Sequence, residues 1–104
     1  MNPSIFYISA LNGSDQSGDG SILNPWQTIN YALSQIVANA APITIRVTDD
    51  TYPENVLVDQ NGAVINLIGG CDESFLSCST QTTIKGTLEI ADATIVVENI
   101  VLEP

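Results

Sequence analysis

The 104-residue sequence has no histidine, only two cationic side chains and no long apolar run. The absence of histidine excludes a histidine-dependent catalytic triad. Two cations cannot neutralise a nucleic-acid backbone, so we expect no nucleic-acid partner. No apolar stretch approaches the roughly 20 residues that span a bilayer, and we expect no membrane insertion. The first residues also lack the basic and apolar regions of a secretory signal peptide.

The charges that are present are almost all negative. Twelve acidic residues against two basic ones give a net charge of −10. This charge disfavours acidic glycans and anionic membrane surfaces, and it is compatible with divalent cations and neutral sugars. The acids can equally form a solvated surface that keeps the chain soluble. Apolar residues make up 44% of the chain, enough for the buried core of one small domain.

The two cysteines, Cys71 and Cys78, are close together in the sequence. No histidine or further cysteine accompanies them, so a four-ligand zinc site has no support. The pair can form a disulfide that closes a short loop, as expected in an extracellular setting, or can remain two thiols.

The first part of the chain reads as a strand, a turn-rich segment and one helix. Alternation predicts a strand over residues 5–9, and glycine, asparagine and aspartate favour turns over residues 12–21. Asn24 suits a helix N-cap and Pro25 the first helical position. The spacing predicts an amphipathic helix over about residues 25–40, ending before Pro42. Its apolar stripe is Trp26, Ile29, Leu33, Ile36, Val37 and Ala40.

The remainder of the chain reads as strands. Strand signals cover residues 43–48, 55–59, 63–68, 83–85, 88–90 and 94–102, with an irregular loop at 71–80. Asn61-Gly62 favours an antiparallel hairpin and hence a meander. The strands at Ile43 and Val64 instead start 21 residues apart, a length typical of one solenoid coil. Periodicity alone leaves both topologies open.

Several motifs in order resemble one family. The likeness lies in Tyr7-Ile8-Ser9, Gly13-Ser14-Asp15, Gly18 to Gly20, Pro25 to Ile29 with Ala32, Ile45 to Val47, Asp50 to Glu54, and Ile65 to Phe75. Together they resemble the N-terminal cap and first coils of right-handed parallel β-helix proteins of the pectate-lyase-like superfamily, especially bacterial surface proteins. Asp50 stands where the family usually has glycine, and Cys71 where an aromatic residue is usual.

The resemblance implies a fold for the whole chain. We expect a mainly β domain over residues 1–104, a short right-handed parallel β-helix of about three coils, capped at its N-terminal end by one amphipathic α-helix. The cap would comprise residues 1–42 and the coils residues 43–104. Because the family usually has many more coils, we expect a piece of a longer solenoid. Its last coil would pair with another copy or with downstream coils, through Thr94, Val96, Ile100 and Leu102.

The resemblance also implies a function. We expect a non-enzymatic structural or adhesive module of a bacterial extracellular or cell-surface protein, which caps and initiates a β-helix. One alternative is the cap of a β-helix polysaccharide lyase or glycoside hydrolase whose catalytic residues lie outside this chain. Another is a stand-alone interaction module that pairs through its open last coil. We expect no catalytic residue here, since nothing in the sequence pairs Arg46 or Lys85 with an acidic cluster.

Two groups of acidic residues stand out in the sequence. Asn12, Asp15 and Asp19 place hard oxygen ligands on a glycine-rich segment, as Ca²⁺ prefers, although these side chains can instead bond their own turn. A second acidic group is Asp49, Asp50 and Glu54, for which we expect a structural role. Glu54 matches the turn glutamate of the family it resembles, and a carboxylate here could satisfy backbone N–H groups between coils.

Aromatic side chains could stack on a neutral glycan. Tyr31 and Tyr52 are the candidates for exposed sugar-binding rings. Trp26 lies on the apolar stripe, and we expect it to plug the end of the solenoid.

Overall fold

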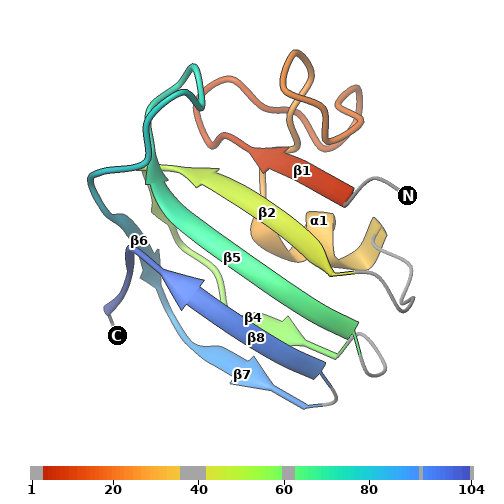
Figure 1. Cartoon of the computed structure of the whole chain (residues 1–104), viewed down its shortest axis with the longest axis vertical. Coiled ribbons are helices and arrows are strands. Elements are labelled where there is room, and N and C mark those ends of the chain that lie inside the picture. Colours follow the sequence, from red (N-terminus) through yellow and green to blue (C-terminus); the bar gives the residue numbers. More distant parts are fainter. Residues whose placement is uncertain (1–3, 36–41, 60–62, 92, 104) are drawn as a thin grey trace.

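The computed structural model describes residues 4–35, 42–59, 63–91 and 93–103 (Figure 1). Within this part the chain is mainly β, with one short helix, and no described helix is long and apolar enough to cross a membrane. The elements are β1 (Ser4–Ile8), α1 (Ile29–Gln35), β2 (Ile43–Thr48), β3 (Thr51–Tyr52), β4 (Val56–Val58), β5 (Ala63–Cys71), β6 (Thr82–Lys85), β7 (Leu88–Ile90), β8 (Ala93–Glu98) and β9 (Ile100–Glu103).

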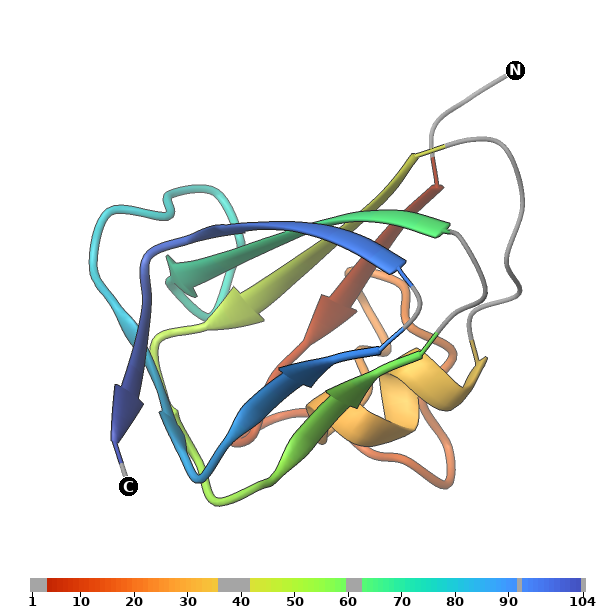
Figure 2. The ribbon, with the colours of Figure 1, turned by 90° about the horizontal axis from the view of Figure 1, so that it is seen from below.

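The strands form three sheets in which every pair is parallel. Their orders are β1-β2-β5-β8, β3-β6-β9 and β4-β7. Figure 2 shows the sheets around a common interior, stacked like the coils of a β-helix. We call β1 the first layer, β2 to β4 the second, β5 to β7 the third, and β8 with β9 the fourth. The antiparallel meander is wrong, because β4 pairs with β7 and β5 pairs with β2 and β8.

The core follows from the parallel register. Ile43, Ile65 and Ile95 occupy facing positions on β2, β5 and β8. Since strand side chains alternate between faces, every second residue points inward and stacks on its counterpart in the next layer. The interior is almost entirely aliphatic, with Ile8, Ile43, Ile45, Val47, Val56, Val58, Ile65, Leu67 and Ile84 fully buried.

One corner of the stack varies in length from layer to layer. Residues 49 and 50 join β2 to β3, whereas residues 72–81 make the same connection from β5 to β6. In the fourth layer Asn99 alone joins β8 to β9. Asn99 has φ 57°, a left-handed conformation that asparagine tolerates better than most residues. The single strand predicted over 94–102 is therefore wrong, because the chain turns this corner at Asn99.

The helix begins four residues later than predicted, at Ile29 instead of Pro25. Trp26 is not helical, because it forms a parallel bridge with Ile8 of β1. The cap is Thr28, whose hydroxyl accepts the N–H of Tyr31. The predicted helix end, with Ile36, Val37 and Ala40, lies outside the described residues. Among the strands, β3 was not predicted, and β5 extends through Gly69 and Gly70 to Cys71.

Candidate functional site

The first-layer end of the stack is closed along β1. The residues after β1 fold back so that Tyr7 N–H donates to Gly20 and Ser9 N–H to Trp26, while Trp26 N–H donates to Tyr7. The outer edge of β1 is thereby hydrogen-bonded. The Trp26 ring stacks on Phe6 with centroids 5.4 Å apart, and its Nε1–H donates to the Gly18 carbonyl. As expected, Trp26 plugs this end, although it does so from a loop.

The helix closes the same end over β4 (Figure 2). The Glu54 carboxylate accepts the N–H groups of Ile29 and Asn30, at 2.8 and 2.9 Å. The Asn30 side chain bonds the edge of β4 in both directions, donating to the Asn55 carbonyl and accepting from Leu57 N–H. A carboxylate of the second acidic group was expected to bond N–H groups between coils; Glu54 instead bonds the first turn of α1.

The fourth-layer end is open. By register, Ile90, Val97 and Leu102 face the interior, next to Val58, Leu67 and Ile84. Those three neighbours are at most 1% exposed, whereas Ile90, Val97 and Leu102 are 47%, 39% and 50% exposed. Leu88, Ile95 and Ile100 are half-buried at the same end. The residue types are alike, so the difference arises because, in the described part of the chain, no further strand covers β7, β8 or β9.

The open end also has strand edges available for pairing. In the described residues β8, β9 and β7 are the last strands of their sheets. Of the four predicted interface residues, Ile100 and Leu102 face the interior at this end. Thr94 and Val96 lie on β8 at outward positions, beside Val64 and Asn66. The predicted interface thus combines inward and outward residues of one layer, and its role in association stays a prediction.

The three residues predicted to bind calcium have separate hydrogen-bond partners. Asp15 accepts from the N–H groups of Gln27 and Thr28 and from the Thr28 hydroxyl. Asp19 accepts from Ser21 N–H, and hydrogen bonding from Ser21 lowers the Asp19 pKa below its ordinary value of 3.8. Asn12 donates to Glu73. Asp15 therefore fixes the segment before α1, and Asp19 stabilises its own turn.

A closer group of carboxylates lies at the variable corner. Asp49, Asp50 and Glu73 can bring one oxygen each within 4.8 Å of one another. Oxygen atoms at such spacing can hold a divalent cation. Each carboxylate also accepts an internal hydrogen bond: Asp49 from Thr80, Asp50 from Thr48, and Glu73 from Ser9 and Asn12. The bonds of Asp49 and Glu73 tie the 72–81 segment to the second and first layers.

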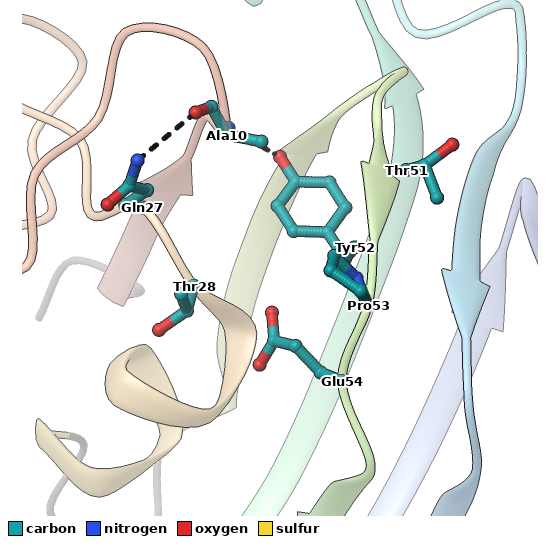
Figure 3. Close-up of a pocket in the computed structure, with 7 residues that line it drawn as sticks. All are labelled: Ala10, Gln27, Thr28, Thr51, Tyr52, Pro53 and Glu54. Carbon is teal, nitrogen blue, oxygen red and sulfur yellow. Dashed lines mark hydrogen bonds between the residues drawn. The ribbon is translucent and has the colours of Figure 1, made fainter.

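A half-open pocket of about 200 Å³ lies between the first-layer loop, the start of α1 and β3 (Figure 3). It is lined by Ala10, Gln27, Thr28, Thr51, Tyr52, Pro53 and Glu54. Its principal polar groups are already bonded within the chain, since Glu54 holds the helix start and the Tyr52 hydroxyl accepts Ala10 N–H at 2.9 Å. The pocket is large enough for a small molecule and has few unused polar groups to orient one.

The exposure predicted for Tyr52 is wrong. The ring is 1% exposed and stacks on Ile84 through the register of β3 and β6. Its hydroxyl also bonds Thr48 at 2.7 Å, and burial raises the Tyr52 pKa above its ordinary value. Tyr31 is half-buried with its ring edge against Trp26. Neither ring is free to stack on a sugar with both faces, and Tyr52 instead anchors the second layer to Ala10.

The 72–81 segment carries the disulfide. Cys71 and Cys78 are bonded to each other, and their backbones form an antiparallel bridge. Phe75 of this segment packs its ring against Tyr7, with centroids 4.8 Å apart. Arg46 lies beneath it, with Nη1 3.4 Å from the Phe75 carbonyl and a buried Nε that has no hydrogen-bond partner among the described residues. The segment is thus fastened at both ends and across its middle.

Sequence reasoning missed several of these residues. Glu73 contacts Ser9 and Asn12, which are 64 and 61 positions away, and no local pattern reveals so distant a contact. Asn30 falls on the polar side of the predicted helix, a position that gave no sign of its bonds to β4.

Comparisons with protein-family models, with curated proteins and with solved structures give no match for the chain.

Proposed function

We propose that this chain is a non-enzymatic structural module that caps and initiates a right-handed parallel β-helix. One end of the stack is closed by Trp26 and α1, and the other receives the next β-coil. The observation that carries the proposal is the exposed fraction of Ile90, Val97 and Leu102, which continue the inward ladder without a covering layer. A further coil would bury them as the fourth layer buries Leu67 and Ile84.

Solenoid energetics support this role. In a solenoid the strands of each layer stack on those of the neighbouring layers, and a terminal layer needs a cap to avoid exposing its interior and strand edges. The first-layer end has such a cap in Trp26, Asn30 and Glu54. At the fourth layer, β8 and β9 retain the register and apolar alternation that parallel stacking uses.

We propose an extracellular or cell-surface setting for the module, where its stack would form part of a stalk or adhesive surface. The disulfide between Cys71 and Cys78 supports that setting, since reducing compartments seldom leave such bonds intact. The order of motifs from Tyr7 to Phe75, which resembles that of bacterial β-helix surface proteins, supports the same choice.

The direct test is to append a segment whose strands would stack on β7 and β8. Two residues separate Lys85 of β6 from Leu88 of β7, and a copy of residues 55–70 appended after Pro104 leaves the same two-residue spacing between Glu103 and the copied Val56. The copied Val56 and Val58 would then lie on Leu88 and Ile90, and the copied Ile65 and Leu67 on Ile95 and Val97.

The control extension has serine at the four copied positions 56, 58, 65 and 67. We expect the apolar extension to unfold at higher urea concentration and to bind less apolar dye than this control, because it buries the open end. Equal urea midpoints and equal dye binding for the two extensions would show that the fourth layer does not accept a further coil.

A further inference from the structure

The open end is rimmed by glutamates. Each of its three edge strands has one outward-pointing, exposed acid: Glu89 on β7, Glu98 on β8 and Glu103 on β9. Their outward direction follows from the register, which places them beside Leu57, Ile68 and Lys85 of the layers below. The described edge strands at the closed end, β1, β3 and β4, contain no charged residue. Every acidic residue within a described strand therefore lies on an edge that remains unpaired in the described chain.

The outward direction of Glu89, Glu98 and Glu103 determines which residues of a further layer would lie beside them. In a parallel stack an outward residue lies beside the outward residue of the next layer, at about 5 Å. Like charges at such positions destabilise pairing, and opposite charges stabilise it. The chain already contains one opposite-charge rung, since Lys85 and Glu103 face each other in the register of β6 and β9.

We propose, as an extension of the proposed function, that the glutamate rim selects the occupant of the open end. The occupant is a β-coil that continues the stack and has lysine or arginine at the outward positions beside Glu89, Glu98 and Glu103. A second copy of this chain is rejected, because two open ends in contact have antiparallel strands and gather six negative rim charges around one interface. The apolar interior supplies the attraction, and the rim distinguishes the correct coil from a copy of itself.

The test uses three forms of the chain at low ionic strength, with molar mass measured by light scattering over a concentration series. They are the wild type, E89Q/E98Q/E103Q and E89K/E98K/E103K. We expect the wild type and the lysine form to be monomers when alone. The glutamine form should self-associate with an association constant at least roughly tenfold higher than that of the wild type, because three negative charges are removed from each open end. An equimolar mixture of wild type and lysine form should associate, and added salt should weaken that mixture.

Two controls locate the effect. D49N/D72N/E73Q removes the same number of charges from acids that are not on β7, β8 or β9, and it should stay monomeric. Leu102→Asp, placed in the glutamine form, should abolish its self-association because it adds a charge to the open interior.

Self-association of the wild type as strong as that of the glutamine form would overturn the rim proposal. So would association of D49N/D72N/E73Q, which would assign the effect to net charge. A mixture of wild type and lysine form that stays monomeric would overturn it as well. The extension experiment does not depend on rim charge. A stabilising extension together with inert rim variants would therefore refute the selection by glutamates and leave the capping function standing.

Discussion

At its first layer the stack ends against an indole ring, a helix and side chains that bond backbone groups, whereas at its fourth layer it ends in half-exposed aliphatic side chains and a rim of glutamates. The contrast is clearest along single ladders. Tyr52, Ile84 and Leu102 face one another in successive layers, yet their exposed fractions are 1%, 0% and 50%. Burial in this fold is thus supplied by the next layer, and similar residues become core or surface according to their neighbours.

Truncating Trp26 at the closed end should have the largest effect on the free energy of unfolding. Trp26→Ala deletes the stack on Phe6, the contact with Tyr31 and the bond to Gly18. Truncating a buried aromatic residue costs about 3–5 kcal/mol, so we expect the free energy of unfolding to fall by that amount. Urea denaturation followed by circular dichroism measures it.

Trp26→Phe is the matched control for this change. It keeps a ring on Phe6 and should retain most of the stability. If the alanine variant were as stable as the phenylalanine variant, the closed end would not depend on this ring.

The second prediction compares equivalent positions one layer apart. Ile84→Ala should lower the free energy of unfolding by about 2–5 kcal/mol because it leaves a cavity between layers. Leu102→Ala, at the facing position in the open layer, should cost about 1 kcal/mol or less, since half of that side chain is already in contact with water. Thermal and urea unfolding of both variants gives the difference. Equal losses would mean that the open end is covered in solution.

The third prediction concerns the carboxylate at the start of α1. Glu54→Ala removes the acceptor of two backbone N–H groups, and we expect a loss of about 1–2 kcal/mol. Glu54→Gln retains one carbonyl acceptor and should lose less. Hydrogen exchange at Ile29 and Asn30 reports the change locally, and unchanged exchange rates in the alanine variant would contradict the capping role.

The smallest effect on stability should come from protonation of Asp19, at the closed end. Because hydrogen bonds from Ser21 lower the Asp19 pKa from 3.8, its contribution to stability is present above that value and is lost as pH falls through the lowered pKa. We expect Asp19→Asn to lower stability slightly at neutral pH, where the charged carboxylate contributes, and to flatten the loss in the acid range. An NMR titration of the Asp19 carboxyl group checks the direction, and a midpoint at or above 3.8 would refute it.

Local pattern predicted the regular elements well. The bounds of 43–48 and 88–90 match β2 and β7, because alternating residues in both strands place one face in the interior. The same signals misplaced the helix start. Asn24-Pro25 has the chemistry of a helix N-terminus, but the backbone of Trp26 bonds to β1, a contact that spacing within one segment cannot reveal.

The candidate site was harder to predict for a related reason. Tyr52 looked available to a sugar because it stands among polar turn residues, yet the layer above covers it and Ala10 binds its hydroxyl. The acidic triplet unites Asp49 and Asp50 with a glutamate from the next layer. In a parallel stack, neighbours in space are separated by a whole layer of sequence, so contacts at corners escape any short window.

The variable corner has a consequence for how this chain can change. The connection there contains two residues after β2, ten after β5 and one after β8. The strands after the corner keep their register, and β2 and β5 before it shift in register between Arg46 and Thr48. Insertions at this corner therefore need not alter the hydrogen bonds of the sheets. Over evolutionary time such a position can gain or lose loops, and a peptide grafted into residues 72–81 would need to keep Phe75 and Cys78, which hold the segment to Tyr7 and Cys71.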